Sequence, residues 1–284
     1  MEICKAIDDL KATLWGKPGL VLVPTMGALH RGHFALIEEA RRCAGKSGTV
    51  LVSIFVNPTQ FGAGEDFTRY PSRPAEDKAH CEEAGVDILF EPEAGEMYAA
   101  DASIKVMESR LSSHLCGRSR PGHFPAVCTV VLKLFNIARP DIAVFGCKDY
   151  QQLAILRRLV RDLNLDVEIV GVPTVRDQDG VAVSSRNLNL TGEERYQAAV
   201  IAKALFAVQT ETVKGERDAA ILIEMARAII AKSPLAKIDY AEVVDPDDLQ
   251  PVRRIDKRAV FAVAVFLGKN RLIDNIELVP PAEG

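Results

Sequence analysis

The sequence lacks the features that mark several large classes of protein. Its six cysteines form no CxxC pair, and in a chain of 284 residues without a secretory signal we expect them to be reduced thiols. The first residues, Met1–Lys5, hold no basic stretch followed by an apolar one, so they do not predict a signal peptide. The longest apolar run, residues 259–267, is too short to span a bilayer and predicts a buried strand. We therefore expect a cytoplasmic protein that does not associate with membranes.

An excess of basic charge is also missing. The chain has 35 Lys and Arg against 39 Asp and Glu, which gives a net charge of −4. Nucleic-acid phosphates require clustered basic side chains, so a tRNA or DNA partner is disfavoured. The chain also lacks both GxxxxGK[ST] and GxGxxG. Any phosphate-binding site must therefore be built without these two glycine-rich loops.

Strand-like and helix-like segments alternate through the first three-quarters of the chain. Apolar, often β-branched runs predict strands, and the amphipathic stretches between them predict helices. The expected strands are residues 19–24, 49–56, 86–90, 141–146 and 167–172, and the expected helices are residues 32–44, 74–84, 124–138 and 150–163. This alternation predicts an α/β fold with a doubly wound parallel sheet, which is typical of nucleotide-binding proteins.

The pattern changes after Pro173. Thr191-Gly-Glu-Glu194 has the form of a capping box that opens a helix. The expected elements are helices at 191–210 and 216–232, then strands at 238–244, 259–267 and 271–277. Helices followed by adjacent strands predict a smaller α+β domain. We therefore expect two domains, residues 1–174 and 175–284.

The segment Pro24–His33 directly follows the first expected strand. In a parallel α/β fold, ligands bind beyond the carboxyl ends of the strands, at the N-terminus of the following helix. Gly27 and Gly32 allow the backbone to approach a nucleotide closely. His30 and His33 are one helical turn apart, so both imidazoles can donate hydrogen bonds to an α-phosphate. A metal pair or helix-capping histidines are the alternatives, and the position after a strand favours the nucleotide.

Three further segments carry polar groups that suit a nucleotide or a small polar substrate. Asn57 and Gln60 are neutral amides that follow the second strand, although an Asn-Pro turn with an incidental Gln explains them equally well. Lys148 can neutralise phosphates and Asp149 can contact ribose or Mg²⁺, with a surface helix start as the alternative. The run 183–186, Val-Ser-Ser-Arg, offers hydroxyls and a guanidinium to a phosphate, unless it is a solvated linker.

In their order and spacing, these segments resemble the pantothenate synthetase (pantoate–β-alanine ligase) family. The likeness is carried by residues 24–33, 55–62, 83–87, 120–124, 133–136, 145–152 and 161–186, and more weakly by 238–244. The HxGH element alone would indicate only the wider superfamily of nucleotidylyltransferases and class I aminoacyl-tRNA synthetases, with its Rossmann-like fold. The resemblance implies a two-step ligase, in which ATP adenylates pantoate in the presence of Mg²⁺ and β-alanine then displaces AMP to give pantothenate.

The resemblance also implies roles for individual residues. His33, His30 and Lys148 would be catalytic. Gln60, Gln152 and Asn57 would bind pantoate or β-alanine. The implied ATP-binding residues are Met26, Gly27, Ala28, Leu29, His30, Arg31, Gly32, His33, Gly146, Cys147, Lys148, Asp149, Val175, Val183, Ser184, Ser185 and Arg186. Mg²⁺ would be held mainly by ATP, with Asp149 as its one candidate protein contact, and the enzyme would be a cytoplasmic homodimer.

The chain departs from the family pattern at three places. Cys147 stands where the family usually has Glu, Ala126 where it usually has Gly, and Ser72 lies in a segment that usually reads Tyr-Pro-Arg-Thr. Three other functions remain as alternatives. Another nucleotidyltransferase would not need the three neutral amides, a tRNA synthetase would need a basic surface, and a non-enzymatic nucleotide sensor would not be expected to keep both His33 and Lys148.

Overall fold

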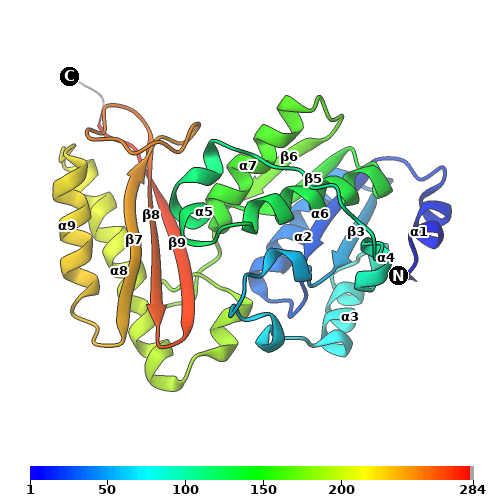
Figure 1. The fold of residues 1–284 in the computed structure, drawn as a ribbon, viewed down its shortest axis with the longest axis horizontal. Coiled ribbons are helices and arrows are strands. Elements are labelled where there is room, and N and C mark those ends of the chain that lie inside the picture. Colours follow the sequence, from blue (N-terminus) through cyan, green and yellow to red (C-terminus); the bar gives the residue numbers. More distant parts are fainter. Residues whose placement is uncertain (282–284) are drawn as a thin grey trace. The chain divides into compact units, whose positions relative to one another are not determined.

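Six parallel strands form the first sheet of the protein (Figure 1). The computed structural model describes residues 1–281. The strands are β1 (Glu2–Cys4), β2 (Leu20–Thr25), β3 (Thr49–Ile54), β4 (Ile88–Phe90), β5 (Ile142–Gly146) and β6 (Glu168–Val172). Their order across the sheet is β1-β4-β3-β2-β5-β6, and every neighbouring pair is parallel. The predicted α/β fold with a parallel sheet is confirmed.

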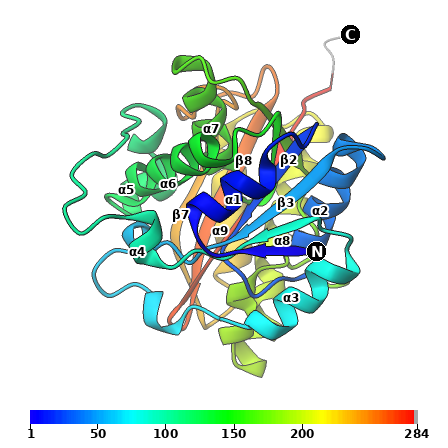
Figure 2. The same cartoon turned by 90° about the vertical axis from the view of Figure 1, so that its right-hand side faces the viewer.

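Helices bury both faces of this sheet. The helices of this part of the chain are α1 (Ile7–Leu14), α2 (Arg31–Ala44), α3 (Pro74–Glu83), α4 (Ala94–Met97), α6 (His123–Ala138) and α7 (Tyr150–Asp162), and α1 lies beside α6 (Figure 2). Val21 and Val23 of β2 pack in one cluster with Leu36 and Ile37 of α2. Leu22, which points to the opposite face, is equally buried. Burial on both faces explains why the strands are continuous apolar runs rather than alternating ones.

The strand β2 marks the point where the order of the sheet reverses. It pairs with β3 on one side and with β5 on the other. In open parallel sheets, ligands bind beyond the carboxyl ends of the strands at such a reversal. The segments that follow Thr25, Ile54 and Gly146, the last residues of these three strands, therefore leave the sheet at the same edge.

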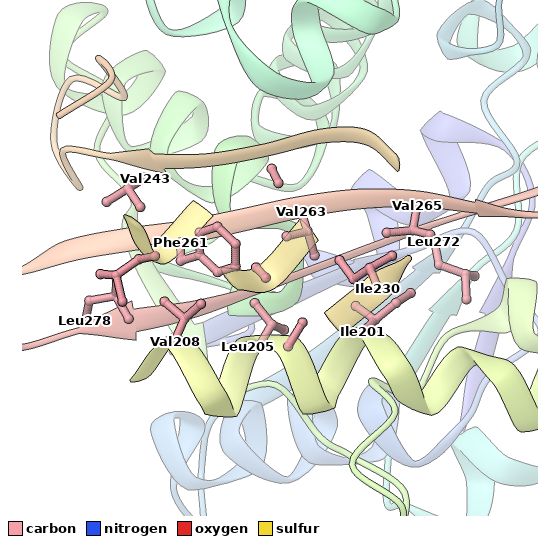
Figure 3. Close-up of a cluster of buried hydrophobic side chains, with 14 of the residues drawn as sticks. Ile201, Leu205, Val208, Ile230, Val243, Phe261, Val263, Val265, Leu272 and Leu278 are labelled. Atoms are coloured by element: carbon pink, nitrogen blue, oxygen red, sulfur yellow. The ribbon is translucent and has the colours of Figure 1, made fainter. Parts of the chain in front are cut away.

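The second sheet is antiparallel and has three strands. These are β7 (Ala236–Val244), β8 (Ala259–Leu267) and β9 (Asn270–Leu278), in the order β7-β8-β9. Helices α8 (Gly192–Val213) and α9 (Ala219–Ile230) pack against it. Figure 3 shows Leu205 and Val208 of α8 pointing toward Phe261 and Val263 of β8, and all four side chains are fully buried. The predicted smaller α+β part is confirmed by this sheet and its two helices.

Two compact units divide the chain. One contains residues 1–108, 120–147 and 155–174, and the other contains 109–119, 148–154 and 175–284. The second unit therefore gathers three segments, of which the first includes helices η3 (Leu111–Ser113) and α5 (Leu115–Ser119). The division into domains at residue 174 remains a prediction. Within residues 1–281, no helix combines the length and the apolar character required to cross a membrane.

Boundaries differ from the sequence prediction mainly where a cap or turn intervenes. The second C-terminal helix begins at Ala219 rather than at 216, because Gly215 has a φ of 108° and the Asp218 carboxylate caps the N–H of Ala220. The strand β3 ends at Ile54 rather than at 56, just before the turn that begins at Asn57. The short elements β1, α1, α4 and α5 were not predicted.

Candidate active site

A short loop between β2 and α2 leads into the HxGH motif. Gly27 and Ala28 have positive φ angles of 78° and 50°. The N–H groups of Ala28 and Leu29 donate to the carboxylate of Asp77 at 2.8 and 2.7 Å. Asp77 belongs to α3 and is only 2% exposed. A Cβ on Gly27 would lie 3.0 Å from Asp77 Oδ2 and 3.1 Å from Ile54 Cγ2, and together with the positive φ these close contacts favour glycine there.

His30 and His33 form the N-terminal cap of α2. His30 is the N-cap residue, and its Nδ1 accepts the N–H of Gly32 at 3.1 Å. His33 Nδ1 accepts the N–H of His30 at 3.2 Å, and the two rings stack with centroids 4.0 Å apart. A neutral imidazole that accepts through Nδ1 carries its proton on Nε2. The backbone thus sets both rings as Nε2–H donors at the positive end of a helix, where anions are stabilised.

This geometry bears on the alternatives for the pair. The histidines do cap the helix, and the two capping bonds are made through Nδ1. Capping through Nδ1 is therefore compatible with the interpretation that the two histidines donate to a phosphate. Among residues 1–281, no group of three or more His, Cys, Asp or Glu is arranged to hold a metal ion.

The residues that follow β3 form a hydrogen-bonded cluster. Asn57 caps the short helix η1 (Pro58–Gln60) and is only 1% exposed. Its Nδ2 donates to Gln60 Oε1 at 3.3 Å, and Gln60 Nε2 lies 2.9 Å from Met26 Sδ. The Tyr98 hydroxyl donates to Asn57 Oδ1 at 3.1 Å. Met26, Asn57 and Gln60, which the sequence assigned to the site, thus contact one another.

The backbone of Gln60 is held separately from its side chain. Its carbonyl accepts from His123 Nδ1 at 2.9 Å and from Arg120 Nη2 at 3.2 Å. Arg120 also makes two bonds to the Glu65 carboxylate, at 2.7 and 2.6 Å. Arg120 Nη1 lies 3.1 Å from His123 Nε2, and because a guanidinium only donates, this nitrogen is the acceptor. Gln60 is therefore tied to the start of α6.

The ion pair between Glu65 and Arg120 lowers the pKa of the Glu65 carboxyl. Burial on its own would raise the pKa of the Glu65 carboxyl. The hydrogen bonds and charge of Arg120 outweigh burial and hold the pKa of Glu65 below its ordinary value. The carboxylate is therefore charged at neutral pH, and an ion pair joins residues 62–70 to Arg120, in the turn before α6.

A second set of predicted site residues follows β5. Gly146 ends the strand, and a 3₁₀ turn, η4 (Cys147–Asp149), leads into α7. Lys148 Nζ lies 3.9 Å from Asp149 Oδ1, and the Lys148 carbonyl accepts from Asn275 Nδ2 at 2.9 Å. Gln152 is partly exposed, whereas the adjacent Gln151 is 6% exposed and bonds to the backbone of residues 111–116. The sequence left open that Lys148 and Asp149 only begin a surface helix, and the structure shows that the backbone at this helix start is held by hydrogen bonds.

A third set lies on a segment that turns back on itself. The N–H of Val183 donates to the Val175 carbonyl at 2.9 Å, with a turn at Gly180, whose φ is 88°. Ser184 then caps the 3₁₀ helix η5 (Ser185–Asn189), and its Oγ accepts the N–H of Arg186 at 3.3 Å. The structure brings together the predicted residues Val175, Val183, Ser184, Ser185 and Arg186, so this segment is an ordered turn rather than a solvated linker.

Several residues that contact the loop before α2 or the turn at Asn57–Gln60 were not assigned a role from the sequence. Arg120 and His123 stood in the segment Arg-Pro-Gly-His that carries part of the resemblance, and this spacing was the available signal. Asp77 and Tyr98 gave no signal, because their partners are 49 and 41 residues away in the chain. Glu65 looked like one of many acidic residues in a polar stretch.

Comparison with protein families gives a match over almost the whole chain. The model described as pantoate-beta-alanine ligase matches residues 2–277. A pantothenate synthetase from Akkermansia muciniphila is 53% identical, with 91% of this chain and 92% of that protein covered. A pantothenate synthetase from Ruminiclostridium cellulolyticum is 50% identical, with 99% and 100% covered.

Comparison with solved structures points to the same family. The chain resembles the crystal structure of pantothenate synthetase from Thermus thermophilus with a TM-score of 0.94 and 44% identity, over 99% of this chain and 100% of that one. It also resembles a pantoate-beta-alanine ligase from Francisella tularensis with a TM-score of 0.80 and 32% identity, over 97% of each chain. That structure is described as a complex with beta-gamma ATP and beta-alanine.

Proposed function

The chain belongs to the pantoate-beta-alanine ligase family, and from this premise we propose the reaction it catalyses and the role of each site residue. The enzyme condenses (R)-pantoate with β-alanine, using ATP, and forms pantothenate, AMP and pyrophosphate. In the first step, a pantoate carboxylate oxygen bonds to the α-phosphorus of ATP, and the bond from that phosphorus to pyrophosphate breaks. In the second, the β-alanine amine attacks the acyl carbon of pantoyl adenylate. AMP leaves with the electron pair of the broken C–O bond, and the amine loses a proton.

The observation that carries the catalytic assignment is the tautomer of the histidine pair. Both Nδ1 atoms accept backbone N–H groups, so both rings carry their protons on Nε2. We assign His30 and His33 as donors to the phosphate oxygens of ATP, which gain charge as pyrophosphate leaves. Donors that are already oriented stabilise a developing charge without reorganising, and one such donor contributes about 10²–10³-fold in rate.

The remaining roles follow the resemblance and the local geometry. Lys148 would neutralise phosphate charge, and its backbone is anchored by Asn275. Gln60 and Gln152 would bind the hydroxyl and carboxylate groups of pantoate or β-alanine, and Asn57, which is buried against Gln60, would complete the substrate site. The other proposed contacts to ATP are Met26, Gly27, Ala28, Leu29, Arg31, Gly32, Gly146, Cys147, Asp149, Val175, Val183, Ser184, Ser185 and Arg186.

Mg²⁺ is proposed to arrive with ATP. Magnesium in such sites is commonly held by one or two carboxylates and the phosphates of the substrate. Asp149 fits this requirement, because its side chain is 48% exposed and lies next to Lys148. When bound, the ion would supply positive charge to the phosphates.

We also propose a cytoplasmic homodimer, as the family resemblance implies. Light scattering at micromolar concentration is expected to give about twice the chain mass of 31.0 kDa. The mass of a single chain under these conditions would contradict the dimer.

Incubation with ATP, Mg²⁺, pantoate and β-alanine tests the function. We expect pantothenate and AMP in equal amounts, and pantoate without β-alanine should support exchange of pyrophosphate into ATP. Formation of ADP would indicate an acyl-phosphate route and would overturn the adenylate scheme.

A further inference from the structure

A chain of hydrogen bonds leads from Tyr98 to the carboxamide of Gln60. Tyr98 Oη donates to Asn57 Oδ1 at 3.1 Å, and Asn57 Nδ2 donates to Gln60 Oε1 at 3.3 Å. We propose that Tyr98 is a positioning residue that acts through Asn57 to hold Gln60 with its N–H donors turned to the substrate. The inference rests on the proposed function, in which Gln60 binds pantoate or β-alanine.

The orientation of the Asn57 amide is fixed by its own partners. Oδ1 accepts the backbone N–H of Thr59 at 3.3 Å, and it also lies 2.8 Å from Thr59 Oγ1 and 3.1 Å from the Tyr98 hydroxyl. A backbone N–H can only donate, so the atom facing it must be the amide oxygen. The opposite atom is then Nδ2, which donates to Gln60. Asn57 therefore presents a donor to Gln60 rather than an acceptor.

The orientation of the Gln60 carboxamide follows from that of Asn57. Because Asn57 donates to Oε1, the Gln60 oxygen is used and its Nε2 points the other way, where it lies 2.9 Å from Met26 Sδ. A thioether is a weak acceptor, so a carboxylate or hydroxyl oxygen of a substrate is a stronger partner for this N–H. The chain of bonds thus selects a ligand group that accepts hydrogen bonds.

Tyr98 is itself held firmly. Its N–H donates to the Ala94 carbonyl at 2.9 Å, and its ring lies 6.3 Å from that of Phe55, with Lys133 Nζ 5.7 Å from its centroid. Burial raises the pKa of the Tyr98 hydroxyl, although the hydrogen bonds to Thr59 and Asn57 lower it in part. The hydroxyl therefore remains a protonated donor at neutral pH.

The backbone of Gln60 has separate anchors, so the hydrogen bond from Asn57, which Tyr98 supports, acts on the side chain of Gln60. The Gln60 carbonyl accepts from His123 Nδ1 and Arg120 Nη2. Among the torsions of this side chain, rotation of the carboxamide by half a turn would exchange its donor for its acceptor. Without the hydrogen bond from Asn57, only the weak contact of Nε2 with Met26 Sδ would favour one of the two carboxamide orientations over the other.

The first test is Tyr98→Phe, which removes only the hydroxyl, with Tyr196→Phe as the matched control on an exposed residue of α8. One lost hydrogen bond corresponds to about a 3- to 10-fold change. We expect Tyr98→Phe to raise KM for pantoate or β-alanine by about this factor and to leave KM for ATP within about twofold. Equal increases for all three substrates, or none, would overturn the proposal.

A double-mutant cycle shows whether Tyr98 acts through Gln60. In a Gln60→Ala background, Tyr98→Phe should have no further effect on KM for pantoate, because residues of one network are not additive. Two independent, multiplying effects would show that Tyr98 acts by another route.

A second readout does not depend on catalysis. The side-chain amide signals of Gln60 can be identified by ¹⁵N NMR from their absence in Gln60→Met. Tyr98→Phe should shift these signals and Tyr196→Phe should not. Unchanged Gln60 signals in Tyr98→Phe would refute the positioning role. If the wild-type chain forms no pantothenate, the proposed function fails, while these spectra still decide whether Tyr98 orients Gln60.

Discussion

At His33, the Nδ1 atom accepts the N–H of His30, so a substitution changes both a helix cap and an imidazole. The two effects can be separated. Glutamine at the third helical position also accepts this N–H in a capping box, so His33→Gln keeps the cap and removes the ring. Alanine removes both.

We expect both His33 variants to lower pyrophosphate exchange by about 10²–10³-fold, because each loses the imidazole Nε2–H that we propose as a donor to the ATP phosphates. Conversion of preformed pantoyl adenylate with β-alanine should fall much less, since the charge then develops on the acyl group and the departing AMP. Melting curves should place His33→Gln close to the wild type. An equal loss in both half-reactions would mean that His33 is a packing residue.

Between elements, the buried carboxylate of Asp77 links α3 to the loop before α2. Asp77→Ala leaves the N–H groups of Ala28 and Leu29 without their acceptor, and each buried unsatisfied group costs about 1–3 kcal/mol. Urea denaturation should therefore show a loss of about 2–6 kcal/mol in the free energy of unfolding.

The neighbouring Glu76 provides the control for Asp77. It lies on the same helix, is exposed and pairs with Arg73 at 2.9 Å. An exposed pair of this kind contributes about 0–1 kcal/mol, so Glu76→Ala should change stability little. Similar losses in the two variants would show that Asp77 does not hold the loop.

The ion pair between Glu65 and Arg120, which joins residues 62–70 to the turn before α6, predicts that stability depends on pH. The folded-state pKa of Glu65 is lowered, so the stability from this pair is fully present above the ordinary carboxyl pKa, about 4. It is lost as pH falls through the lowered folded-state value. Melting temperatures of the wild type and Glu65→Gln should therefore differ at pH 7 and converge below about pH 4. A difference that persisted in acid would have another origin.

The sequence predicted those elements whose pattern is long and local. The strands β2 and β3 are apolar runs of six residues, and α2 and α8 begin with recognisable caps. The three-residue strand β1 and the four-residue helix α4 are too short to show a period, and only their packing defines them. The candidate site follows the same rule: motifs singled out residues such as His30 and Gln60, whereas Asp77 and Tyr98 contact segments that are distant in the chain.

On the scale of the whole molecule, two adjacent glutamines show how the second unit is assembled. Gln151 accepts the N–H of Cys116 at 2.9 Å and donates to the carbonyls of Leu111 and His114, both at 2.8 Å. It thus joins the segments 109–119 and 148–154. Gln152 is partly exposed and belongs to the proposed substrate site.

Substitution of these two residues should give opposite results. Gln151→Ala leaves three backbone groups unsatisfied and should lower the free energy of unfolding by about 3 kcal/mol. Gln152→Ala should leave stability near the wild type and raise KM for pantoate about 10-fold. Urea denaturation and steady-state kinetics on both variants measure the difference. A kinetic defect without loss of stability in Gln151→Ala would reverse the assignment.

Nothing in the linear pattern predicted that the second unit takes in residues 109–119 and 148–154. Periodicity reports which face of a helix is buried and does not report its partner. Arg118 pairs with Glu242 at 2.6 Å across 124 residues, and such a link becomes visible only in three dimensions.

The bond between Asn275 and the Lys148 carbonyl has a consequence for the order of events during synthesis. A chain leaves the ribosome from its N-terminus, and its parts fold as they emerge. Lys148 is made 127 residues before Asn275, the residue that fixes its backbone. The parallel sheet with its histidine pair can therefore form while β9 does not yet exist. We infer that the backbone at Lys148, a proposed contact to ATP, gains this hydrogen bond only after β9 has been made.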